Sequence, residues 1–308
     1  MPEGVEITIL SQYLKTKLHN RILFKCEILG GKYKRNVFDN YDLLNTNKYR
    51  IIDIDSKGKL LWMTLENMDN KKIIYMTSHL GLTGFWSFEK PKTPKIQITI
   101  EHEKKDVYYY LYYEDDRNFG NINIYLEKEE LQDKIDELAH DALKEDYKST
   151  DFIEWTKKYL SKSEKRGEQY ISIVLMNQKQ SDGIICGIGN YLMAEILYHA
   201  KISPFRKMNT LTNTDLTTLC NSIQYITKLS YYNNTTGYMT HFGDFITLHK
   251  ERIDNGTYPN YHKHIDLKNK EFKFSVYRQE KDPYGNDVKI DKTIQKNRST
   301  YWVFDVQK

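Results

Sequence analysis

Two adjacent residues near the start of the printed sequence have the types needed for covalent chemistry. Methionine before proline is normally removed, so we expect Pro2 to become the mature terminus. A terminal amine has a pKa of about 8, so a useful fraction is neutral and nucleophilic at neutral pH. Its attack on an aldehyde-level carbon would give a cationic iminium, which acidifies the neighbouring carbon. Glu3 stands beside it and could shuttle protons.

A glycine turn, Gly187-Ile188-Gly189-Asn190, opens the helical segment NYLMAEILYHAKISPF. Glycines let a backbone approach a ligand closely, and the free N–H groups at a helix start attract anions. Asn190 could cap this helix or donate to a phosphate. The alternative is an ordinary helix–turn–helix packing unit without a ligand.

Two basic residues in other segments are of types that can bind phosphate. Arg298 lies in a turn flanked by hydroxyls, within Asn297–Trp302, where a guanidinium can grip a phosphate with two hydrogen bonds. Lys59 begins an apolar strand pattern and could hold another phosphate. The alternatives are a solvated turn arginine and a strand-edge lysine that prevents aggregation.

Two apolar residues sit in turns where they could enter a base stack. Leu82 lies between Gly81 and Gly84, and Phe119 precedes Gly120 in the segment DDRNFG, directly after Arg117 and Asn118. Apolar side chains of this kind can wedge between bases. A turn leucine and a buried core aromatic are the alternatives.

Composition and charge limit the class of protein that presents these residues. The chain has 308 residues, 39% of them hydrophobic and 29% charged, and a net charge of +4. These values favour a soluble globular protein. No apolar run reaches the roughly 20 residues of a membrane span. The sequence shows no secretory signal, so we expect an intracellular protein, in the nucleus or cytoplasm. Residues 257–308 hold 11 basic and 7 acidic residues, which places the positive surplus there.

Hydrophobic periodicity divides the chain into three zones. In residues 1–130, a helical pattern from Ile7 to Leu18 precedes short strand-like runs at 59–65, 72–77, 95–100, 106–113 and 121–126, which suggest a sandwich or barrel. Residues 131–235 predict helices, with Asp151, Asn190 and Thr212 as N-caps. In residues 236–308, a polar loop precedes predicted strands in 272–279, 282–294 and 297–306.

The order and spacing of these motifs resemble the formamidopyrimidine-DNA glycosylase and endonuclease VIII family across nearly the whole chain. The resemblance rests on MPEGVE, GK at 58–59, SHLGLTG, DDRNFG, CGIGNYLMAEILYHAKISPF and VYRQ…KNRSTYWV. It implies an α+β fold: an N-terminal helix plus β-sandwich catalytic domain in 1–130, a helix–two-turn–helix DNA-binding domain in 131–235, and a lesion loop with a finger hairpin in 236–308.

The resemblance also implies an activity and residue roles. Family members excise oxidised bases from DNA and then cleave the strand by β,δ-elimination. Matching motif positions make Pro2 the nucleophile and Glu3 the acid/base, with Glu6 in support. Lys59, Asn190 and Arg298 would hold phosphates. The residues that would fill the vacated space and contact the opposite strand are Leu82, Arg117, Asn118 and Phe119.

Two departures from the family pattern narrow the prediction. No cysteine follows Cys220, so a four-cysteine zinc finger is absent and the finger resembles the zincless, endonuclease VIII-like branch. We therefore expect no metal and no cofactor. Leu82 stands where many members have methionine, and Asn118 where many have a second arginine. Resemblance to this branch implies oxidised pyrimidines and ring-opened purines as lesions. We expect a monomer that acts on them in duplex DNA and in single-stranded DNA, with no membrane association.

Two other classes of protein remain to be tested. A non-catalytic DNA-binding relative would explain the glycine turn and the basic end of the chain but would not need Pro2, Glu3 or Lys59. A metal-dependent nuclease is disfavoured because the sequence has no clustered Asp/His ligand motif. Borohydride trapping would separate the first class from an enzyme, and cleavage in excess chelator would exclude the second.

Overall fold

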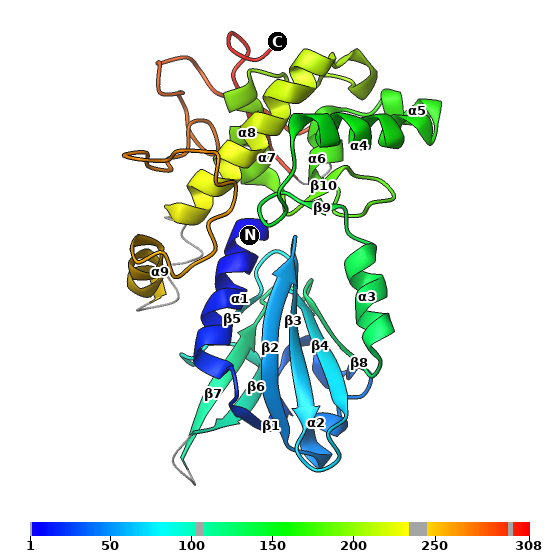
Figure 1. The fold of residues 1–308 in the computed structure, drawn as a ribbon, viewed down its shortest axis with the longest axis vertical. Coiled ribbons are helices and arrows are strands. Elements are labelled where there is room, and N and C mark those ends of the chain that lie inside the picture. The colour runs from blue at the N-terminus through cyan, green and yellow to red at the C-terminus, as the bar shows by residue number, and fades with distance from the viewer. Residues whose placement is uncertain (1, 103–106, 234–244, 295–297) are drawn as a thin grey trace. The chain divides into compact units, whose positions relative to one another are not determined.

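The structure is a computed structural model that describes residues 2–102, 107–233, 245–294 and 298–308. The chain divides into two compact units (Figure 1). The first unit contains residues 6–136 together with Pro2 and part of the segment 236–249. The second contains Glu3–Val5 and the chain from 137 to 235 and from 250 to 308. Each unit is described by itself.

Helix α1 (Gly4–Leu18) forms where the spacing of apolar residues predicts it. Leu10, Leu14 and Leu18 recur every four residues and are fully buried, so they share one face of the helix. One polar contact of α1 reaches strand β2 (Tyr49–Lys57): the hydroxyl oxygens of Ser11 and Ser56 are 3.1 Å apart. α1 therefore packs its apolar face within the first unit and is tied to the sheet by polar contacts along its side.

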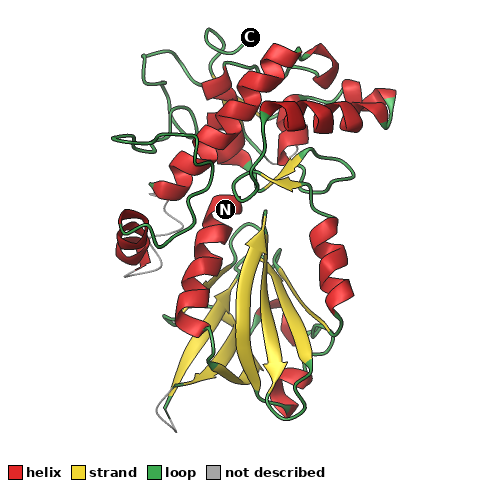
Figure 2. Ribbon diagram, in the orientation of Figure 1, coloured by secondary structure: helices red, strands yellow, loops and turns green. Residues whose placement is uncertain are grey.

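The described part of the first unit contains one eight-stranded antiparallel sheet (Figure 2). Its order is β5-β7-β6-β1-β2-β3-β4-β8. The strands are β1 (Ile22–Ile28), β2 (Tyr49–Lys57), β3 (Leu60–Asn67), β4 (Ile73–His79), β5 (Phe85–Ser87), β6 (Pro94–Glu101), β7 (Tyr108–Glu114) and β8 (Asn121–Tyr125). β1 and β2 share only two residue pairs, so the sheet has two halves joined at a short pairing. Short helical segments η1 (Gly31–Lys34) and α2 (Leu43–Thr46) follow β1, and α3 (Lys128–Asp136) follows β8.

The alternation of buried residues explains why these runs form strands. In β3, every second residue is buried, namely Leu61, Met63, Leu65 and Asn67. A period of two places those side chains on one face of the sheet. The five predicted strand runs of the first zone correspond to β3, β4, β6, β7 and β8, and the predicted mixed α+β class is confirmed.

Helices dominate the second unit. They are α4 (Ser149–Ser161), α5 (Glu164–Gly167), α6 (Ile171–Met176), α7 (Asn190–Ala200), η2 (Met208–Thr210), α8 (Asn213–Tyr232) and α9 (Phe245–Asp254), whose first part belongs to the first unit. Short strands β9 (His140–Asp141) and β10 (Ile185–Cys186) pair in parallel, and β11 (Lys289–Asp291) and β12 (Thr300–Trp302) in antiparallel. α7 contacts α6, α8 and β12, and most of its residues are buried. It is therefore the central helix of this unit.

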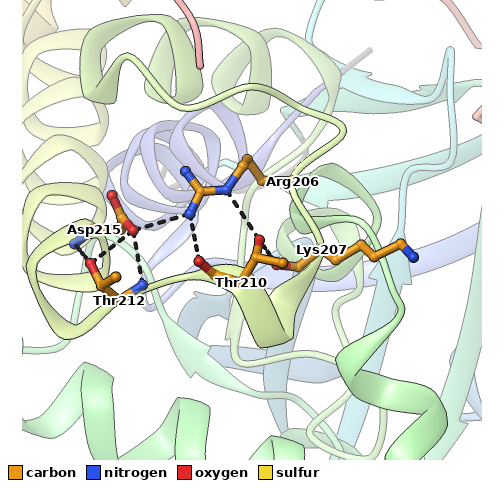
Figure 3. Close-up of polar contacts among 5 residues, drawn as sticks. All are labelled: Arg206, Lys207, Thr210, Thr212 and Asp215. Carbon is orange, nitrogen blue, oxygen red and sulfur yellow. Dashed lines mark hydrogen bonds and ion pairs between the residues drawn. The ribbon is translucent and has the colours of Figure 1, made fainter.

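A polar network fixes the start of α8 (Figure 3). Thr212 caps the helix as predicted: its hydroxyl accepts from the backbone N–H of Asp215 at 3.1 Å, and the Asp215 carboxylate accepts from the Thr212 N–H at 2.8 Å. This reciprocal arrangement satisfies two N–H groups that would otherwise lack a partner. Arg206 adds an ion pair to Asp215 at 3.1 Å and a hydrogen bond to the carbonyl of Thr210.

Several local predictions were wrong. Residues 133–143 begin the zone predicted to be helical, but their helix ends at Asp136 and the chain then enters β9. The strand predicted over 272–279 does not form. Asp151 is the third residue of its helix rather than the cap, and Gly189, not Asn190, is the N-cap of α7.

The polar loop at the start of the third zone contains helix α9, which the sequence did not predict. Residues 237–244 of the predicted lesion loop lie outside the described residues. No helix in the described ranges is long and apolar enough to cross a membrane. The division into domains at residues 130 and 235 stays a prediction.

Candidate active site

The carboxylate of Glu3 binds the N-terminus of α7. It accepts hydrogen bonds from the backbone N–H groups of Gly189 at 2.7 Å, Tyr191 at 2.9 Å and Leu192 at 3.2 Å. The first N–H groups of a helix have no partner within it, and they lie at the positive end of the helix dipole. Glu3, which is only 1% exposed, therefore supplies the cap that the α7 sequence lacks, and the three donors fix the orientation of its carboxylate.

The backbones of the first motif and the glycine turn are in direct contact. Gly4 donates its N–H to the carbonyl of Gly187 at 2.7 Å. A Cβ atom on Gly4 would lie 2.6 Å from the Cα of Gly187, which real Cβ atoms do not tolerate. Gly187 itself has φ +93°, a conformation that favours glycine. The glycines of both motifs are thus required for Glu3 to reach α7, and Pro2 immediately precedes this contact.

Asn190 connects α7 to the segment that carries Arg298. Its side-chain Nδ2 donates to the backbone carbonyl of Ser299 at 2.9 Å. Its Oδ1 is buried and has no hydrogen-bond partner in the described part of the chain. The Arg298 side chain is exposed, with Nη1 3.9 Å from the sulfur of Met176. Asn297, part of the same motif, lies outside the described residues.

The segments around β12 are held together by side-chain contacts that involve no cysteine. The Glu195 carboxylate of α7 accepts three backbone N–H groups, from Ser275 at 2.9 Å, Val276 at 3.0 Å and Tyr277 at 2.8 Å. Burial raises the pKa of Glu195 above its ordinary value, although these three donors oppose the rise. Ala194, Val276 and Val303 form a buried apolar cluster beside it. Among the residues that the structure describes, no group of three His, Cys, Asp or Glu side chains could hold a metal ion.

In the first unit, the turn that carries Leu82 packs against the loop that carries Phe119. A Cβ on Gly81 would lie 2.7 Å from the backbone nitrogen of Gly120. The buried Asp115 joins the two segments: its Oδ1 accepts from the hydroxyl of Thr83 and its Oδ2 from the N–H of Gly120, each at 2.7 Å. Phe119 is 59% exposed and Leu82 is half-buried. The structure therefore brings these two predicted residues together on adjoining loops.

Arg117 and Asn118 differ in how far they are available to a ligand. The Arg117 side chain is exposed, and its backbone N–H donates to the Thr83 hydroxyl at 3.2 Å. Asn118 has φ +54°, which asparagine tolerates better than most residues. Its Oδ1 accepts from the backbone N–H of Lys32 at 3.1 Å. The amide oxygen of Asn118 therefore has a structural partner, and a longer arginine could not reproduce that contact.

Lys59 and Glu6 occupy different parts of the first unit. Lys59 lies in the turn between β2 and β3, after Gly58, whose φ is +53°. Burial, followed by the charge of Lys59, lowers the pKa of His79. Glu6 lies in the first turn of α1 and is 1% exposed.

Two important positioning residues were missed from the sequence. Asp115, the first aspartate of DDRNFG, resembles an ordinary turn residue until Thr83 is known to be its partner. Glu195 interrupts the otherwise apolar NYLMAEILY, and that interruption is a recognisable signal because a carboxylate on a buried helix face needs donors.

Three parts of the chain match domains of one known protein family. Residues 1–122 match the formamidopyrimidine-DNA glycosylase N-terminal domain, residues 138–240 its H2TH domain, and residues 263–308 its C-terminal domain. The chain belongs to the formamidopyrimidine-DNA glycosylase family. The family predicted from the motifs and the predicted enzyme class, a DNA glycosylase with abasic-site lyase activity, are confirmed.

Similar proteins cover the full length of the chain. A formamidopyrimidine-DNA glycosylase of Prochlorococcus marinus (strain MIT 9301) is 26% identical over 325 residues, covering 100% of both chains. One from Mycoplasma genitalium is 28% identical over 242 residues, 77% of this chain and 78% of that protein. Among solved structures, the Lactococcus lactis Fpg complex with FAPY-dG-containing DNA has a TM-score of 0.70 at 18% identity, covering 99% of this chain and 100% of that one.

Proposed function

We propose that this member of the family excises oxidised bases through an iminium formed on Pro2, with Glu3 as the acid/base residue. The observation that carries the proposal is the anchoring of Glu3. Three backbone donors fix the carboxylate of the residue next to Pro2. A proton-transfer group is effective only when it is held in one geometry. Removal of Met1, which lies outside the described residues, is part of this proposal.

The proposed reaction begins at the Pro2 nitrogen. The neutral Pro2 nitrogen attacks C1′ of the damaged nucleotide, and the bond from C1′ to the base breaks. The base leaves with the bonding electron pair and takes up the proton that the Pro2 nitrogen loses after its attack. The ring oxygen receives a proton from Glu3 as the sugar opens, giving the iminium. Loss of a proton from C2′ then expels the 3′ phosphate, and a second elimination expels the 5′ phosphate. Water finally hydrolyses the iminium and releases Pro2.

We assign the other predicted residues to holding the DNA. Arg298 and Lys59 would contact phosphates, and Asn190 would support the Arg298 segment through Ser299 while offering its remaining amide hydrogen to a phosphate. Glu6 would support the catalytic pair from the first turn of α1. Extruding a nucleotide costs a few kcal/mol, which such phosphate contacts offset. Leu82 and Phe119 would fill the vacated space, with Arg117 and Asn118 on the opposite strand.

For substrates, we propose ring-opened purines and oxidised pyrimidines, in duplex DNA and in single-stranded DNA, acted on by a monomer. The name shared by the relatives supports the ring-opened purines. The absence of finger cysteines in the sequence supports the endonuclease VIII-like branch and, with it, the pyrimidines. Excision rates on a panel of defined lesions in both forms of DNA would test this choice. A preference for intact 8-oxoguanine over every pyrimidine lesion would contradict it.

The mechanism is tested by borohydride trapping on a duplex with one oxidised base. We expect a covalent protein–DNA product whose peptide map places the link on Pro2. Pro2→Gly, or extra residues ahead of Pro2, should abolish or greatly slow base excision. A non-catalytic DNA-binding relative would bind this duplex without a trapped product. Undiminished excision by an N-terminally extended protein would exclude Pro2 as the nucleophile.

A further inference from the structure

Lys32 is anchored to the loop that carries Phe119 through both its backbone and its side chain. Its backbone N–H donates to Oδ1 of Asn118 at 3.1 Å, and its ammonium donates to Oδ1 of Asn121 at 2.5 Å. Asn118 directly precedes Phe119, and Asn121 begins β8 two residues after it. All these residues belong to the first unit, although Lys32 and Asn118 are 86 positions apart. The fold therefore holds this ammonium beside the Phe119 loop.

The turn that contains Lys32 is itself packed onto this loop. Lys32 lies in η1, and the buried Tyr33 next to it donates its hydroxyl to the carbonyl of Gly120 at 3.4 Å. On the other side of Lys32, Gly31 has φ +70°, which favours glycine, and a Cβ there would lie 2.6 Å from Oδ1 of Asn118. Three successive residues of η1 are therefore fitted to the loop, and a change in the position of the loop would move Lys32 with it.

The positive charge of Lys32 is not balanced by a carboxylate in the described ranges of the chain. Its ammonium contacts the neutral amide of Asn121 and the ring of Tyr33, whose centroid is 5.4 Å away. An ammonium has three N–H donors, so two of them remain for a ligand. The exposed carboxylate of the loop, Asp116, lies beside another cation: its Oδ1 is 3.9 Å from Nζ of Lys95. The loop therefore does not neutralise Lys32.

Arg35 places a second cation on the same side of η1. Its backbone N–H donates to the carbonyl of Lys32 at 3.0 Å, which is the pattern of a 3₁₀ turn. Side chains three positions apart in such a turn eclipse one another, so those of Lys32 and Arg35 leave it on one side. The Arg35 side chain is exposed and forms no ion pair with any residue that the structure describes. Lys34, which is also exposed, leaves the turn on a different side.

The contact with Asn118 bears on a departure from the family pattern. Asn118 stands where many members have a second arginine, and its amide carries no charge. Its Oδ1 nevertheless holds the backbone of a residue that does carry one. Together with Arg117, which is exposed in the loop, Lys32 and Arg35 give this part of the first unit three cations without a carboxylate partner among the described residues. Because DNA presents a phosphate at every step, such a set favours DNA over a ligand with a single charge.

We propose that Lys32 and Arg35 bind phosphates of the DNA strand opposite the lesion, and that Asn118 is the positioning residue that holds Lys32 for this contact. Ammonium and guanidinium groups both recognise phosphate. The assignment to the opposite strand rests on the proposed function, in which Phe119 enters the duplex and the adjoining loop residues face that strand. Asn118 then acts through Lys32 and not by a direct contact with DNA.

Salt-dependent binding tests the phosphate contacts. The full-length protein is titrated at several salt concentrations with a duplex that carries an uncleavable abasic-site analogue, so that binding is measured without catalysis. Each phosphate that a cation neutralises contributes about 0.9 to the slope of log K against log salt. Lys32→Gln and Arg35→Gln should each reduce the slope by about that amount and weaken binding at low salt about tenfold.

Lys34→Gln is the matched control for these two variants. It removes the same charge from the same turn, but on a side that we do not assign to DNA. A general loss of positive charge would affect all three variants equally, whereas a direct contact affects only two. We therefore expect Lys34→Gln to keep a slope close to that of the wild type. The melting temperature of each variant reports whether it is folded.

Neutral linkages in the DNA identify the strand. Methylphosphonates replace single phosphates near the analogue, on either strand of the duplex. On the opposite strand, one such linkage should weaken binding of the wild type but not of Lys32→Gln, because that variant has already lost the contact. On the lesion strand, each linkage should weaken binding of the two proteins equally.

Asn118→Gly tests the positioning role of Asn118. Glycine accepts the φ of +54° at this position but lacks the oxygen that holds Lys32. If Asn118 acts through Lys32, Asn118→Gly should lower the salt slope as Lys32→Gln does, and the double variant should lower it no further. A direct contact of Asn118 with DNA would instead give additive losses of affinity, and a purely structural role would lower the melting temperature without changing the slope. Either of these results would overturn the positioning role.

The phosphate contacts are overturned if Lys32→Gln and Arg35→Gln, both folded, keep the wild-type slope, or if Lys34→Gln lowers the slope as much as they do. The strand assignment is overturned if the methylphosphonate effect that Lys32→Gln removes lies on the lesion strand. Because the analogue is not cleaved, these results do not depend on an iminium at Pro2. Failure of borohydride trapping would contradict the proposed chemistry and leave the phosphate contacts standing.

Discussion

The side-chain amide of Asn190 donates a hydrogen bond to the backbone carbonyl of Ser299, with 2.9 Å between Nδ2 and the oxygen. Asn190 is the first residue of α7, and Ser299 follows Arg298. The Asn190 amide therefore does more than a DNA-binding interpretation, which assigns it wholly to phosphate, would suggest. It is also the link that positions Arg298. At this end of α7, Glu3 holds the backbone N–H groups and Asn190 holds the Arg298 segment.

This link predicts different outcomes for two alanine variants. Arg298→Ala should slow excision of lesions without changing the melting temperature, because the arginine is exposed. Asn190→Ala should slow excision and also lower the free energy of unfolding by about 0.5–1.5 kcal/mol, since a part-buried hydrogen bond is lost. Single-turnover excision rates and thermal melts on both proteins would check this.

Two controls accompany these variants: one keeps the positive charge at position 298, and the other removes metal ions. Arg298→Lys keeps the charge but not the two-pronged donor geometry, so we expect only partial recovery of excision. Excess chelator should leave wild-type excision unchanged. Stoichiometric zinc in the purified protein would contradict the zincless finger, and a large drop in melting temperature for Arg298→Ala would show that the residue is structural.

Glu3→Gln should have two separable effects. Loss of the proton-transfer group should slow base excision by about 10²- to 10⁴-fold. Because the three N–H donors contact both carboxylate oxygens, an amide would turn its NH₂ toward at least one donor. That mismatch should lower the free energy of unfolding by about 1–3 kcal/mol. Rates below the melting transition, DNA affinity and thermal melts separate the two effects.

Glu195→Gln is the matched control for Glu3→Gln. Glu195 also accepts three backbone N–H groups with both oxygens, so its amide variant should be destabilised to a similar degree. We expect it to retain far more excision activity. Equal losses of excision in the two variants would point to a structural role for Glu3.

The sequence predicted elements that local periodicity determines. Helix α1 carries a regular apolar pattern over several turns, and strand β3 carries one over several residue pairs. Both elements are present in the structure. The segment 272–279 also alternates, yet it is not a strand, because the N–H groups of Ser275, Val276 and Tyr277 are bonded to Glu195. Periodicity says which face is buried but not which partner takes the backbone hydrogen bonds.

The site was predicted as a set of residue types, not as a set of contacts. Glu3 was singled out for its place beside Pro2. Its role as the cap of α7 joins residues 186 positions apart, and no local pattern contains that information. Motif resemblance pointed to Leu82 and Phe119, but only the structure shows that Asp115 ties their loops together.

His262 should make the stability of the second unit depend on pH. It is 1% exposed, its Nε2 lies 3.0 Å from the carbonyl of Ala142, and its Nδ1 has no partner in the described part of the chain. Burial is the largest effect and lowers the pKa of His262 below 6.5, although the hydrogen bond to Ala142 opposes it. Smaller effects come from His264 and Lys228, which lower the pKa, and from Asp146, which raises it. The unfolded chain therefore binds the proton at a higher pH than the folded chain does.

The sign of the effect follows from this difference. Between pH 6.5 and the lowered folded pKa, the unfolded state holds more protons, so the free energy of unfolding falls as the pH falls. The contribution is fully present above pH 6.5. His262→Gln, whose amide can still donate to Ala142, should flatten the dependence of melting temperature on pH in that window. His19→Gln, at an exposed position, should leave it unchanged, and an equally steep wild-type and His262→Gln dependence would refute the assignment.

Leu82 and Phe119 should act together as the wedge that replaces an extruded nucleotide. Their loops are in contact through Gly81 and Gly120 and are joined by Asp115, so displacement of one side chain should affect the other. Phe119 is 59% exposed, which makes core packing a poor explanation for a phenylalanine at this position. An exposed aromatic is useful where neighbouring bases would otherwise close over the vacated space.

Leu82→Ala and Phe119→Ala should each slow excision from duplex DNA much more than from single-stranded DNA, in which no stack has to be held open. The Phe119 variant should keep the wild-type melting temperature, and Tyr284→Ala, at a residue 84% exposed in the second unit, serves as the control for loss of an exposed ring. In a double-mutant cycle the two losses should be less than additive, because either truncation alone already weakens the wedge. Single-turnover rates on both forms of DNA decide the matter: equal losses on duplex and single strand, accompanied by a lower melting temperature, would mean that these side chains stabilise the loops and do not enter the DNA.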